Sequence, residues 1–516
     1  GISILSLGLA TMKLPKFKIL LILSFIFQLS IAQEVKWGTP VTPKPTTGDV
    51  VSLGWHDGFL YNLQIGSVWT NIGLSMVAKD NIRLEKVSKN AEVIFTKDLS
   101  KEGAGDIDSY TQYTALIKDG EVRVFYIVEK RGQNMLKSIT YDLEGNLKKN
   151  GTVHQYHRET CFSKLFKNRT DQFAINKFSF SISPNDLKIG VTSVCLARNN
   201  QYEITTVVFN ADGSEAKVHK NSFNTVGNIT RFINRQLAVD DDGNAMFNYN
   251  IQEFKPKVYT KNVLATSKEG EVLSNRQLGR DDGSINYDDI FIKFSKNNEA
   301  YMAGAAKVSE SDKSIFFTKF DLAQLGTMEF PTYFKNDKLI LTEPKHRGAF
   351  YFDIKFGENG KGFLILNLID SEGIGSGTIQ KNYGLLVFPF DAKAKLNNYS
   401  LVPRLSKFNG FYIEPYPSCV KNGKLYLLYD DHEENVNFDK VEQMKTLMHS
   451  EISAIYLATI SADNVVTRKI LWTEKELKGD LHLVKNQESD TGFLINLKDA
   501  GKGMYGKRVL YGKVDF

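Results

Sequence analysis

The chain has 516 residues, of which 42% are hydrophobic and 24% charged, as in a globular protein with a large buried core. Aromatic residues reach 12% and proline is scarce at 12 residues, which favours strands over helices. The net charge of +6 falls to +3 without the three lysines of the N-terminal segment, and this near neutrality argues against a nucleic-acid binder with a concentrated basic face.

The N-terminal segment predicts export. From Met12 the sequence reads MKLPKFKILLILSFIFQLSIAQ, with three lysines before an apolar run and small residues just before Gln33. This pattern is typical of a secretory signal peptide, so we expect residues 1–32 to be removed after Ala32. The apolar run is shorter than the roughly 20 residues that span a bilayer. We therefore expect a periplasmic or extracellular protein that does not span the membrane.

One short pattern recurs through residues 33–516. An apolar run ends at Ser, Asp or Asn, turns and resumes, as in LKSITYDLEGNLKKNG (136–151) and NVLATSKEGEVLS (262–274). The spacing between successive turns is 54 to 70 residues, and the turns begin at Ser88, Asp142, Asn210, Ser267, Asp321, Asp391 and Ser461. A recurring unit of this size indicates a repeat architecture.

A second pattern precedes each of these turns. It is a tight turn followed by a strand rich in aromatic and branched residues, as in KDGEVRVFYIV (118–128) and KNGKLYLLYD (421–430). Gly and Asn suit the left-handed backbone of tight hairpin turns. Each unit thus predicts four antiparallel strands, A to D, and such sheets bury both faces when they are stacked radially. We predict an all-β protein that forms a single β-propeller.

The number of units and the closure of the ring follow from the ends of the repeat. Eight A–B turns predict eight blades. Seven blades is the alternative, because the region 66–81 of the first unit is irregular. The last unit ends with a third strand, and residues 33–45 contain a lone strand before the first unit. We predict that residues 33–45 complete the last blade, which removes exposed strand edges.

In its repeat shape and its N-terminal segment, the chain resembles the exported, divergent β-propeller proteins of Gram-negative bacteria, especially Bacteroidota. The resemblance covers most of residues 33–516. The Trp-Asp repeat signature, the sialidase Asp-box and the kelch Gly-Gly pair are absent from the sequence, so no functional residue is transferred. The resemblance implies docking to outer-membrane machinery, as a plug or adaptor on a secretion or uptake channel.

Candidate ligand residues lie in the D–A connections, which lead into the innermost strands of a propeller. The segments are GDIDSY (105–110), RDDGSINYDD (280–289) and EPKHRGAFYFD (343–353). The predicted ligand rim consists of Asp108, Tyr110, Tyr287, Asp288, Arg347 and Tyr351.

These residues leave two classes of function open. Paired carboxylates at the central axis would make the protein a carbohydrate-active enzyme with a glycan substrate. The sequence has no nucleophile elbow, phosphate-binding loop or paired metal-histidine motif. We therefore favour a non-enzymatic binding or scaffold protein that docks a protein partner and needs no cofactor.

Residues 429–451 interrupt the seventh unit between strands B and C. The segment starts with four acidic residues, but it lacks the glycine-spaced pattern of a calcium loop. Apolar residues then follow at helical spacing, which predicts a short amphipathic helix. It either folds over the rim of the ring or offers an apolar stripe to a partner. The stripe consists of Phe438, Val441, Met444, Leu447 and Met448.

His154, His157 and Cys161 fall at helical spacing, but a zinc site usually needs a fourth ligand. We interpret this stretch as a polar connection between units and predict no metal site. The three cysteines are too few for a disulfide scaffold. Three cysteines allow one disulfide bond, and the candidate pair is Cys161 and Cys195, the closest in sequence.

Overall fold

The computed structural model describes seventeen stretches between residues 35 and 499 and one after them. They are residues 35–38, 47–72, 75–107, 111–130, 133–156, 178–198, 200–254, 258–280, 286–307, 313–328, 332–333, 349–374, 377–409, 416–447, 453–473, 480–483, 492–499 and 508–515.

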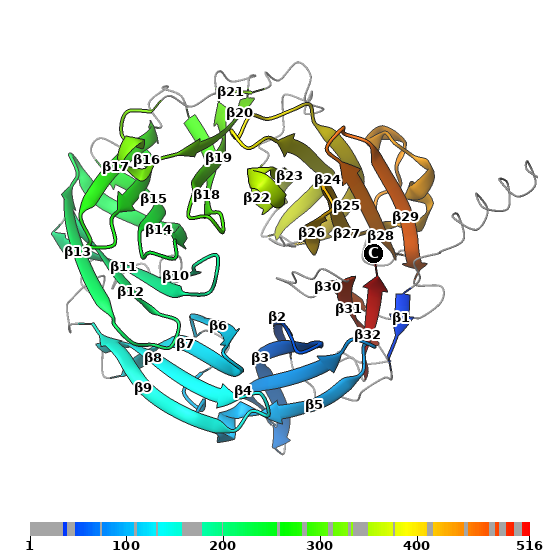
Figure 1. Ribbon diagram of the computed structural model, residues 1–516, viewed down its shortest axis with the longest axis horizontal. Helices are drawn as coiled ribbons and strands as arrows, with labels where there is room; N and C mark the ends of the chain where they lie inside the picture. Colours follow the sequence, from blue (N-terminus) through cyan, green and yellow to red (C-terminus); the bar gives the residue numbers. More distant parts are fainter. Residues whose placement is uncertain are drawn as a thin grey trace, which may run out of the picture.

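The strands in this part of the chain pair into eight four-stranded antiparallel sheets, arranged around a central opening (Figure 1). Sheet one consists of β2 (Thr47–His56), β3 (Phe59–Ile72), β4 (Ser75–Ser88) and β5 (Val93–Asp98), and sheet two of β6 (Tyr113–Lys118), β7 (Glu121–Lys130), β8 (Gln133–Asp142) and β9 (Leu147–Gln155). Sheet three consists of β10 (Phe178–Ile182), β11 (Lys188–Arg198), β12 (Gln201–Asn210) and β13 (Lys217–Asn224). Sheet four consists of β14 (Asn228–Val239), β15 (Ala245–Phe254), β16 (Val258–Thr266) and β17 (Val272–Arg280).

Sheets five to eight follow in chain order. Sheet five consists of β18 (Asn286–Phe294), β19 (Ala300–Lys307), β20 (Lys313–Phe320) and β21 (Thr332–Tyr333), and sheet six of β22 (Ala349–Phe356), β23 (Gly362–Ile374), β24 (Gly377–Phe390) and β25 (Ser400–Asn409). Sheet seven consists of β26 (Ser418–Lys421), β27 (Lys424–His432), β28 (Ser453–Ser461) and β29 (Val466–Thr473). Sheet eight consists of β30 (Asp480–Leu483), β31 (Gly492–Asp499), β32 (Arg508–Asp515) and β1 (Val35–Trp37). The prediction of an all-β propeller of four-stranded antiparallel blades is confirmed.

The helical elements are short 3-10 turns. They are η1 (Leu99–Lys101), η2 (Leu322–Gln324), η4 (Glu358–Gly360), η5 (Glu433–Asn437) and η6 (Val441–Gln443). None of the helices in the described stretches has the length and apolar character needed to cross a membrane.

Sheet eight is built from two distant parts of the sequence. β1 pairs antiparallel with β32, with Val35 opposite Val514 and Trp37 opposite Gly512. The Gly38 N–H also donates to the Tyr511 carbonyl at 2.9 Å. A strand from the start of the described chain is therefore the fourth strand of a sheet whose other three strands come from its end.

The hydrophobic core lies between the sheets. A cluster of buried side chains joins each pair of neighbouring sheets around the ring. Between sheets one and two, Leu84 packs with Tyr126, and between sheets seven and eight Trp472 packs with Phe493. Each fully buried side chain of this size contributes about 1.5–3 kcal/mol. The stacking of sheets thus supplies the burial that one sheet could not obtain alone.

The recurring sequence pattern corresponds to a capped five-residue turn between strands C and D. In the stretch 142–146, the Asp142 carboxylate accepts hydrogen bonds from the Glu144 N–H at 3.1 Å and the Asn146 N–H at 2.7 Å. Gly145 takes the left-handed conformation, with φ 79°. Ser88, Ser267 and Asp391 cap their turns in the same way. In these four turns, the residue that ends the apolar run is therefore the cap of the turn.

The direction of the strands separates the connections onto two faces of the ring. Consecutive strands in each sheet are antiparallel neighbours, so the A–B and C–D turns lie on one face. The B–C and D–A connections lie on the other.

Candidate functional site

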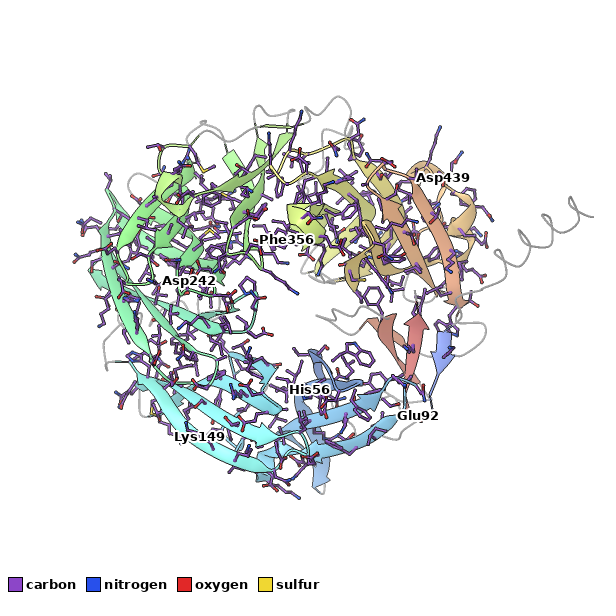
Figure 2. The ribbon with its side chains drawn as sticks, viewed as in Figure 1. His56, Glu92, Lys149, Asp242, Phe356 and Asp439 are labelled. Carbon is purple, nitrogen blue, oxygen red and sulfur yellow. The ribbon has the colours of Figure 1, made fainter. Side chains whose placement is uncertain are left out.

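A cavity of about 590 Å³ opens where the innermost strands of five consecutive sheets end. Its walls come from the last residues of β10, β14, β18 and β22, from the turns that follow them, and from β26. Figure 2 shows Phe356, one of the lining residues, at the inner edge of the ring. The cavity therefore lies at the A–B turn end of the central opening.

The walls combine apolar surface with a few charged groups. Apolar lining residues are Ile182, Ala238, Val239, Phe291, Phe294, Ile354, Phe356 and Val420. Charged lining residues are Lys293, Lys296, Glu299 and Lys355. The side chains of Ala238, Val239, Phe294 and Ile354 are themselves buried, so the wall is a mixture of apolar and polar surface. The volume is in the range of small-molecule sites.

Two lysines of the cavity share one carboxylate. The Lys293 ammonium lies 3.5 Å from Asp353 Oδ1, and the Lys355 ammonium lies 3.3 Å from Asp353 Oδ2. The Lys293 and Lys355 side chains are 31% and 16% exposed. Partial burial opposes ionisation of Asp353, but the two ammonium groups outweigh it and lower its pKa.

The carboxylate of Glu299, which lines the cavity, is also paired. Glu299 Oε1 lies 3.0 Å from the Lys319 ammonium, and Glu299 Oε2 accepts a hydrogen bond from the Tyr301 hydroxyl at 3.1 Å. The lowered pKa of Asp353 is the opposite of the raised pKa of the carboxylic acid that protonates a leaving group in glycosidases.

The innermost strands of neighbouring sheets are joined by side chains. The Gln236 amide donates to the Ile292 carbonyl at 2.8 Å and accepts from the Ile292 N–H at 2.9 Å. The Lys293 ammonium donates to the Ile354 carbonyl at 2.8 Å, and the Val239 N–H donates to the Ser181 hydroxyl at 3.2 Å. These bonds fix the relative positions of β10, β14, β18 and β22, which form the cavity wall.

The A–B turns around the cavity are also linked. Asn185 of sheet three accepts at its carbonyl from the Lys118 ammonium of sheet two at 3.4 Å. Its side chain donates to Asp241 of sheet four at 2.6 Å and to the Lys296 carbonyl of sheet five at 2.9 Å. Polar contacts thus connect the turns of four consecutive sheets.

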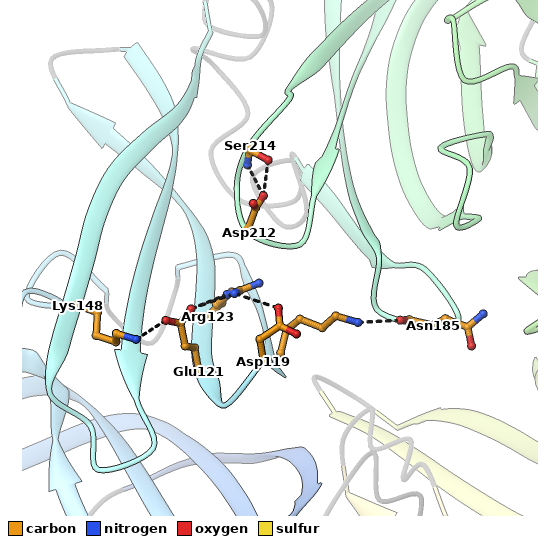
Figure 3. A network of polar contacts seen from close by, with 8 residues as sticks. Asp119, Glu121, Arg123, Lys148, Asn185, Asp212 and Ser214 are labelled. Carbon is orange, nitrogen blue, oxygen red and sulfur yellow. Dashed lines mark hydrogen bonds and ion pairs between the residues drawn. The ribbon is translucent and has the colours of Figure 1, made fainter.

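Figure 3 shows the part of this surface that belongs to sheets two and three. The Arg123 guanidinium lies 2.9 Å from Glu121 Oε2 and 3.5 Å from Asp119 Oδ2. Lys148 and then Arg123 lower the pKa of Glu121 through hydrogen bonds to its carboxylate. These charges pair with one another next to the turns, so we interpret the network as structural.

The structure describes the predicted ligand rim only in part. Asp108, Tyr110 and Arg347 lie outside the described residues. Tyr287 and Asp288 are in the first half of β18, and Tyr351 is in the first half of β22, and only their backbone is described. The cavity is formed at the other end of these two strands. The predicted rim therefore stays a prediction, and its three described members lie at the strand ends opposite the cavity.

The prediction of an amphipathic helix in residues 429–451 is wrong for the described residues. The segment forms the 3-10 turns η5 and η6, and Met444 and Leu447 are only 8% and 4% exposed. The Leu447 N–H donates to the Leu405 carbonyl at 2.7 Å, and the Lys407 N–H donates to the Leu447 carbonyl at 3.0 Å. The apolar pattern reflects packing against β25 of sheet six, whose outer edge the segment extends.

The other residues of the predicted stripe give a mixed result. Phe438 and Val441 are half-buried, and Met448 lies outside the described residues. The acidic start of the segment also turns inward: Asp430 pairs with the Arg404 guanidinium, and Asp431 is fully buried. Binding of a partner by this segment stays a prediction.

The histidine and cysteine predictions fall partly on described residues. His154 lies on β9 and packs edge-on against Tyr156, with ring centroids 4.6 Å apart. Cys195 on β11 is disulfide-bonded, and Cys419 is a reduced thiol. His157 and Cys161 lie outside the described residues. In the described part of the chain, no group of three or more His, Cys, Asp or Glu side chains could hold a metal ion.

Sequence reasoning missed the cavity residues Lys293 and Lys355. The signal is present, because the tripeptide Ile-Lys-Phe occurs at 292–294 and again at 354–356. Both copies end an innermost strand. A basic residue between apolar ones, repeated at the same point of two units, would have indicated a shared site.

Comparison with known proteins identifies no family. No protein-family model matches the chain, and no curated protein matches it.

Several solved structures resemble the chain at low similarity. The WD40 domain of SCAP from fission yeast has 10% identity and a TM-score of 0.37, over 93% of this chain and 98% of that one. The polysaccharide lyase Uly1 has 10% identity and a TM-score of 0.39, over 78% and 89%. A PL25 ulvan lyase has 9% identity and a TM-score of 0.33, over 85% and 94%. Such values support no argument about activity or partner.

Proposed function

We propose that this protein is an exported, non-enzymatic binding or scaffold propeller of the bacterial periplasm or cell exterior. It docks a protein partner, as a plug or adaptor on an outer-membrane secretion or uptake channel. The signal-peptide pattern before Gln33 and the near-neutral charge of the remaining chain support the place and the class of partner. Residues 1–32 are removed on export, with cleavage after Ala32.

One observation at the central cavity favours binding over catalysis. Asp353 and Glu299 are both held in ion pairs with lysines, and the pKa of Asp353 is lowered. A glycosidase needs one carboxylic acid that stays protonated at working pH and a second carboxylate that is ionised. The cavity offers lysines and apolar surface instead, which suits recognition of a ligand.

We also propose that the ring has eight blades and that residues 33–45 close it. The pairing of β1 with β32 supports this closure. So does the cluster that joins sheet eight to sheet one, in which Leu60 and Val87 pack against Tyr511.

The test of function uses the mature chain, residues 33–516. We expect it to bring down a defined channel component from envelope fractions, and to bind that component again when both are purified. A screen of hydrolase and lyase activity on acidic and neutral glycans should give no turnover. Turnover that is lost in Asp108→Asn or Asp288→Asn would replace this proposal with a carbohydrate-active enzyme acting from the predicted rim.

A further inference from the structure

We propose that residues 433–447 form a releasable strap over the outer edge of β25, and that the protonated carboxyl of Asp431 keeps the strap in place. The strap is closed while this carboxyl carries a proton and opens when the proton is lost. Figure 2 shows Asp439 of the strap at the outside of the ring. This inference goes beyond the proposed function, because it concerns a movement within the chain that needs no partner.

The strap is attached to β25 by few main-chain contacts. Leu447 pairs in parallel with Ser406. Its N–H donates to the Leu405 carbonyl at 2.7 Å, and its carbonyl accepts from the Lys407 N–H at 3.0 Å. Among the described residues, these are the two main-chain hydrogen bonds between the strap and β25, whereas β24 pairs with the other edge of β25 at eight positions. The strap is therefore held more weakly than a full strand would be.

Asn435 joins the two ends of the strap to Asp431. Its side-chain amide donates to the Lys445 carbonyl and accepts from the Lys445 N–H, both at 2.8 Å. The same amide donates to Asp431 Oδ1 at 2.9 Å. Asn435 is fully buried, so the strap folds around this side chain. A movement of Asn435 therefore frees residues 445–447 from their position at β25.

Asp431 is buried beside this amide. Its side chain has no exposed surface, and Oδ2 has no hydrogen-bond partner among the described residues. A carboxylate in this position lacks the hydration that an anion needs. Burial is accordingly the largest influence on this carboxyl, and it raises the pKa of Asp431 to about 7. Water reaches the carboxylate when Asn435 and η5 move away, so ionisation favours the open strap.

The charged groups around Asp431 do not replace this hydration. The Arg404 guanidinium lowers the pKa of Asp431, but it is paired with Asp430, whose own charge raises that pKa. The titratable and charged groups in this region come from β25, β27, β28, β29 and the strap. They are Arg404, Tyr429, Asp430, His432, Glu433, Glu434, Asp439, Lys445, Tyr456 and Arg468.

His432 is the rival to Asp431, because imidazoles also titrate near neutral pH. Its Nδ1 accepts from the Glu434 N–H at 3.2 Å, which requires an unprotonated nitrogen. Loss of a proton from His432 thus favours the closed strap, whereas loss of a proton from Asp431 favours the open one. The direction of the pH response therefore distinguishes the two residues.

The first experiment measures hydrogen exchange of residues 33–516 between pH 6 and pH 9, with the intrinsic exchange rate at each pH divided out. Above about pH 7, protection of the Leu447 and Lys407 amides should fall about ten-fold per pH unit, as expected for the loss of one proton. The Ser267 N–H is the internal control, since its turn is capped by a hydroxyl that does not titrate in this range. Protection of the strap that stays constant or rises with pH overturns the proposal.

The release must also be local. β28 contacts the strap through the Tyr456 hydroxyl, which donates to the Glu433 carbonyl at 3.2 Å. The main-chain amides of β28 pair with β27 and should keep their protection at pH 9. Equal loss of protection in β28 and in the strap would mean that the sheet itself unfolds, which overturns the proposal.

The second experiment repeats the exchange profile with variants. Asp431→Asn keeps a neutral group in place, so at pH 9 the strap should be about ten-fold or more better protected than in the wild type. Asn435→Ala removes the amide that joins Lys445 to Asp431, so protection should be low at every pH. Asp463→Asn is the matched control, because Asp463 is exposed in the C–D turn of the same sheet, and it should reproduce the wild-type profile.

The outcomes of these variants decide between the two titrating residues. A wild-type profile in Asp431→Asn, or a profile abolished by His432→Gln alone, contradicts the proposal. Should Asp431→Asn fail to fold, Asn435→Ala still decides, since a strap that keeps its pH-dependent protection without the Asn435 amide is not held through Asp431.

Discussion

At the innermost strands, single side chains supply hydrogen bonds that the sheets cannot. Strand A is an edge strand in each sheet, so its outward-facing N–H and C=O groups have no neighbouring strand to pair with. The Gln236 amide forms hydrogen bonds with both the N–H and the carbonyl of Ile292, whose side chain is fully buried. A primary amide is suited to this role because it has a donor and an acceptor side by side.

Gln236→Ala should therefore lower the free energy of unfolding by about 1–3 kcal/mol, because two main-chain groups lose their partners. The measurement is a urea titration of the mature chain. The matched control is Gln277→Ala, since Gln277 is exposed on β17. If both variants lost the same free energy of unfolding, the two hydrogen bonds between Gln236 of β14 and Ile292 of β18 would contribute nothing to stability.

A second residue, Asp431, makes stability depend on pH. Burial raises its pKa to about 7, against the lowering effect of Arg404. Its Oδ1 accepts from the His432 N–H and the Asn435 amide, and its Oδ2 has no partner among the described residues. The titratable and charged groups around it are Arg404, Tyr429, Asp430, His432, Tyr456 and Arg468.

The sign follows from proton binding. Between the ordinary aspartate pKa of about 4 and the raised value of about 7, the folded chain keeps a proton that the unfolded chain has lost. The contribution of protonated Asp431 to the free energy of unfolding is thus fully present below about pH 4, and it is lost as the pH rises through about 7. Asp431→Asn should match the wild type at pH 4 and exceed it at pH 8, by unfolding free energies measured across this range. Parallel curves for the two proteins would contradict this account.

At the scale of the element, the hairpin between β8 and β9 depends on its cap. Burial opposes ionisation of Asp142, but hydrogen bonds from Asn146 and Glu144 outweigh it and lower its pKa. The stabilisation is therefore present above the ordinary aspartate pKa and is lost as the pH falls through the lowered value. The same turn recurs in other sheets, with Ser or Asp as the cap.

Asp142→Ala should destabilise the chain by about 1 kcal/mol at pH 7, as does the loss of a comparable helix cap. Heat or urea denaturation measures it. Glu144→Ala changes an exposed residue in the same turn and should have little effect. If the two substitutions cost the same, the carboxylate of Asp142 is not what holds the turn.

The elements show what the sequence can and cannot predict. The turns were predictable because their signal is local: the cap and the left-handed residue lie within five residues of each other. The cavity was missed although Ile-Lys-Phe recurs at 292–294 and 354–356, because the repeat alone does not show that Lys293 and Lys355 of two different sheets meet when the sheets stack. The helix predicted from Phe438 failed for a related reason. Its apolar spacing reflects contacts with β25, a tertiary partner that a periodicity in one segment does not reveal.

At the scale of the whole molecule, the junction between sheets eight and one combines three kinds of contact. β1 pairs with β32, Leu60 and Val87 pack against Tyr511, and the Tyr511 hydroxyl donates to the carboxylate of Glu85. Burial raises the pKa of Glu85, although Tyr511 and Asn62 stabilise its charged form. The junction thus includes a buried polar contact beside its apolar ones.

Deletion of residues 33–45 should lower the free energy of unfolding by about 2–4 kcal/mol, because β32 loses its outer partner and each lost hydrogen bond costs about 0.5–1.5 kcal/mol. The melting temperature of chains beginning at residues 33 and 46 measures the effect. A chain that keeps β1 but has residues 39–45 replaced by Gly and Ser is the control. An unchanged melting temperature after the deletion would refute the proposed closure.

The pairing of β1 with β32 also has a mechanical consequence. The two strands are antiparallel, so the first residue of β1, Val35, lies opposite Val514, close to the last residue of β32. A force that pulls these two ends apart acts on one pair at a time and peels the strands open, instead of shearing all pairs together. The same three pairs that complete sheet eight at equilibrium therefore form a seam of low mechanical resistance, and under tension β1 would peel away from β32 one residue pair at a time.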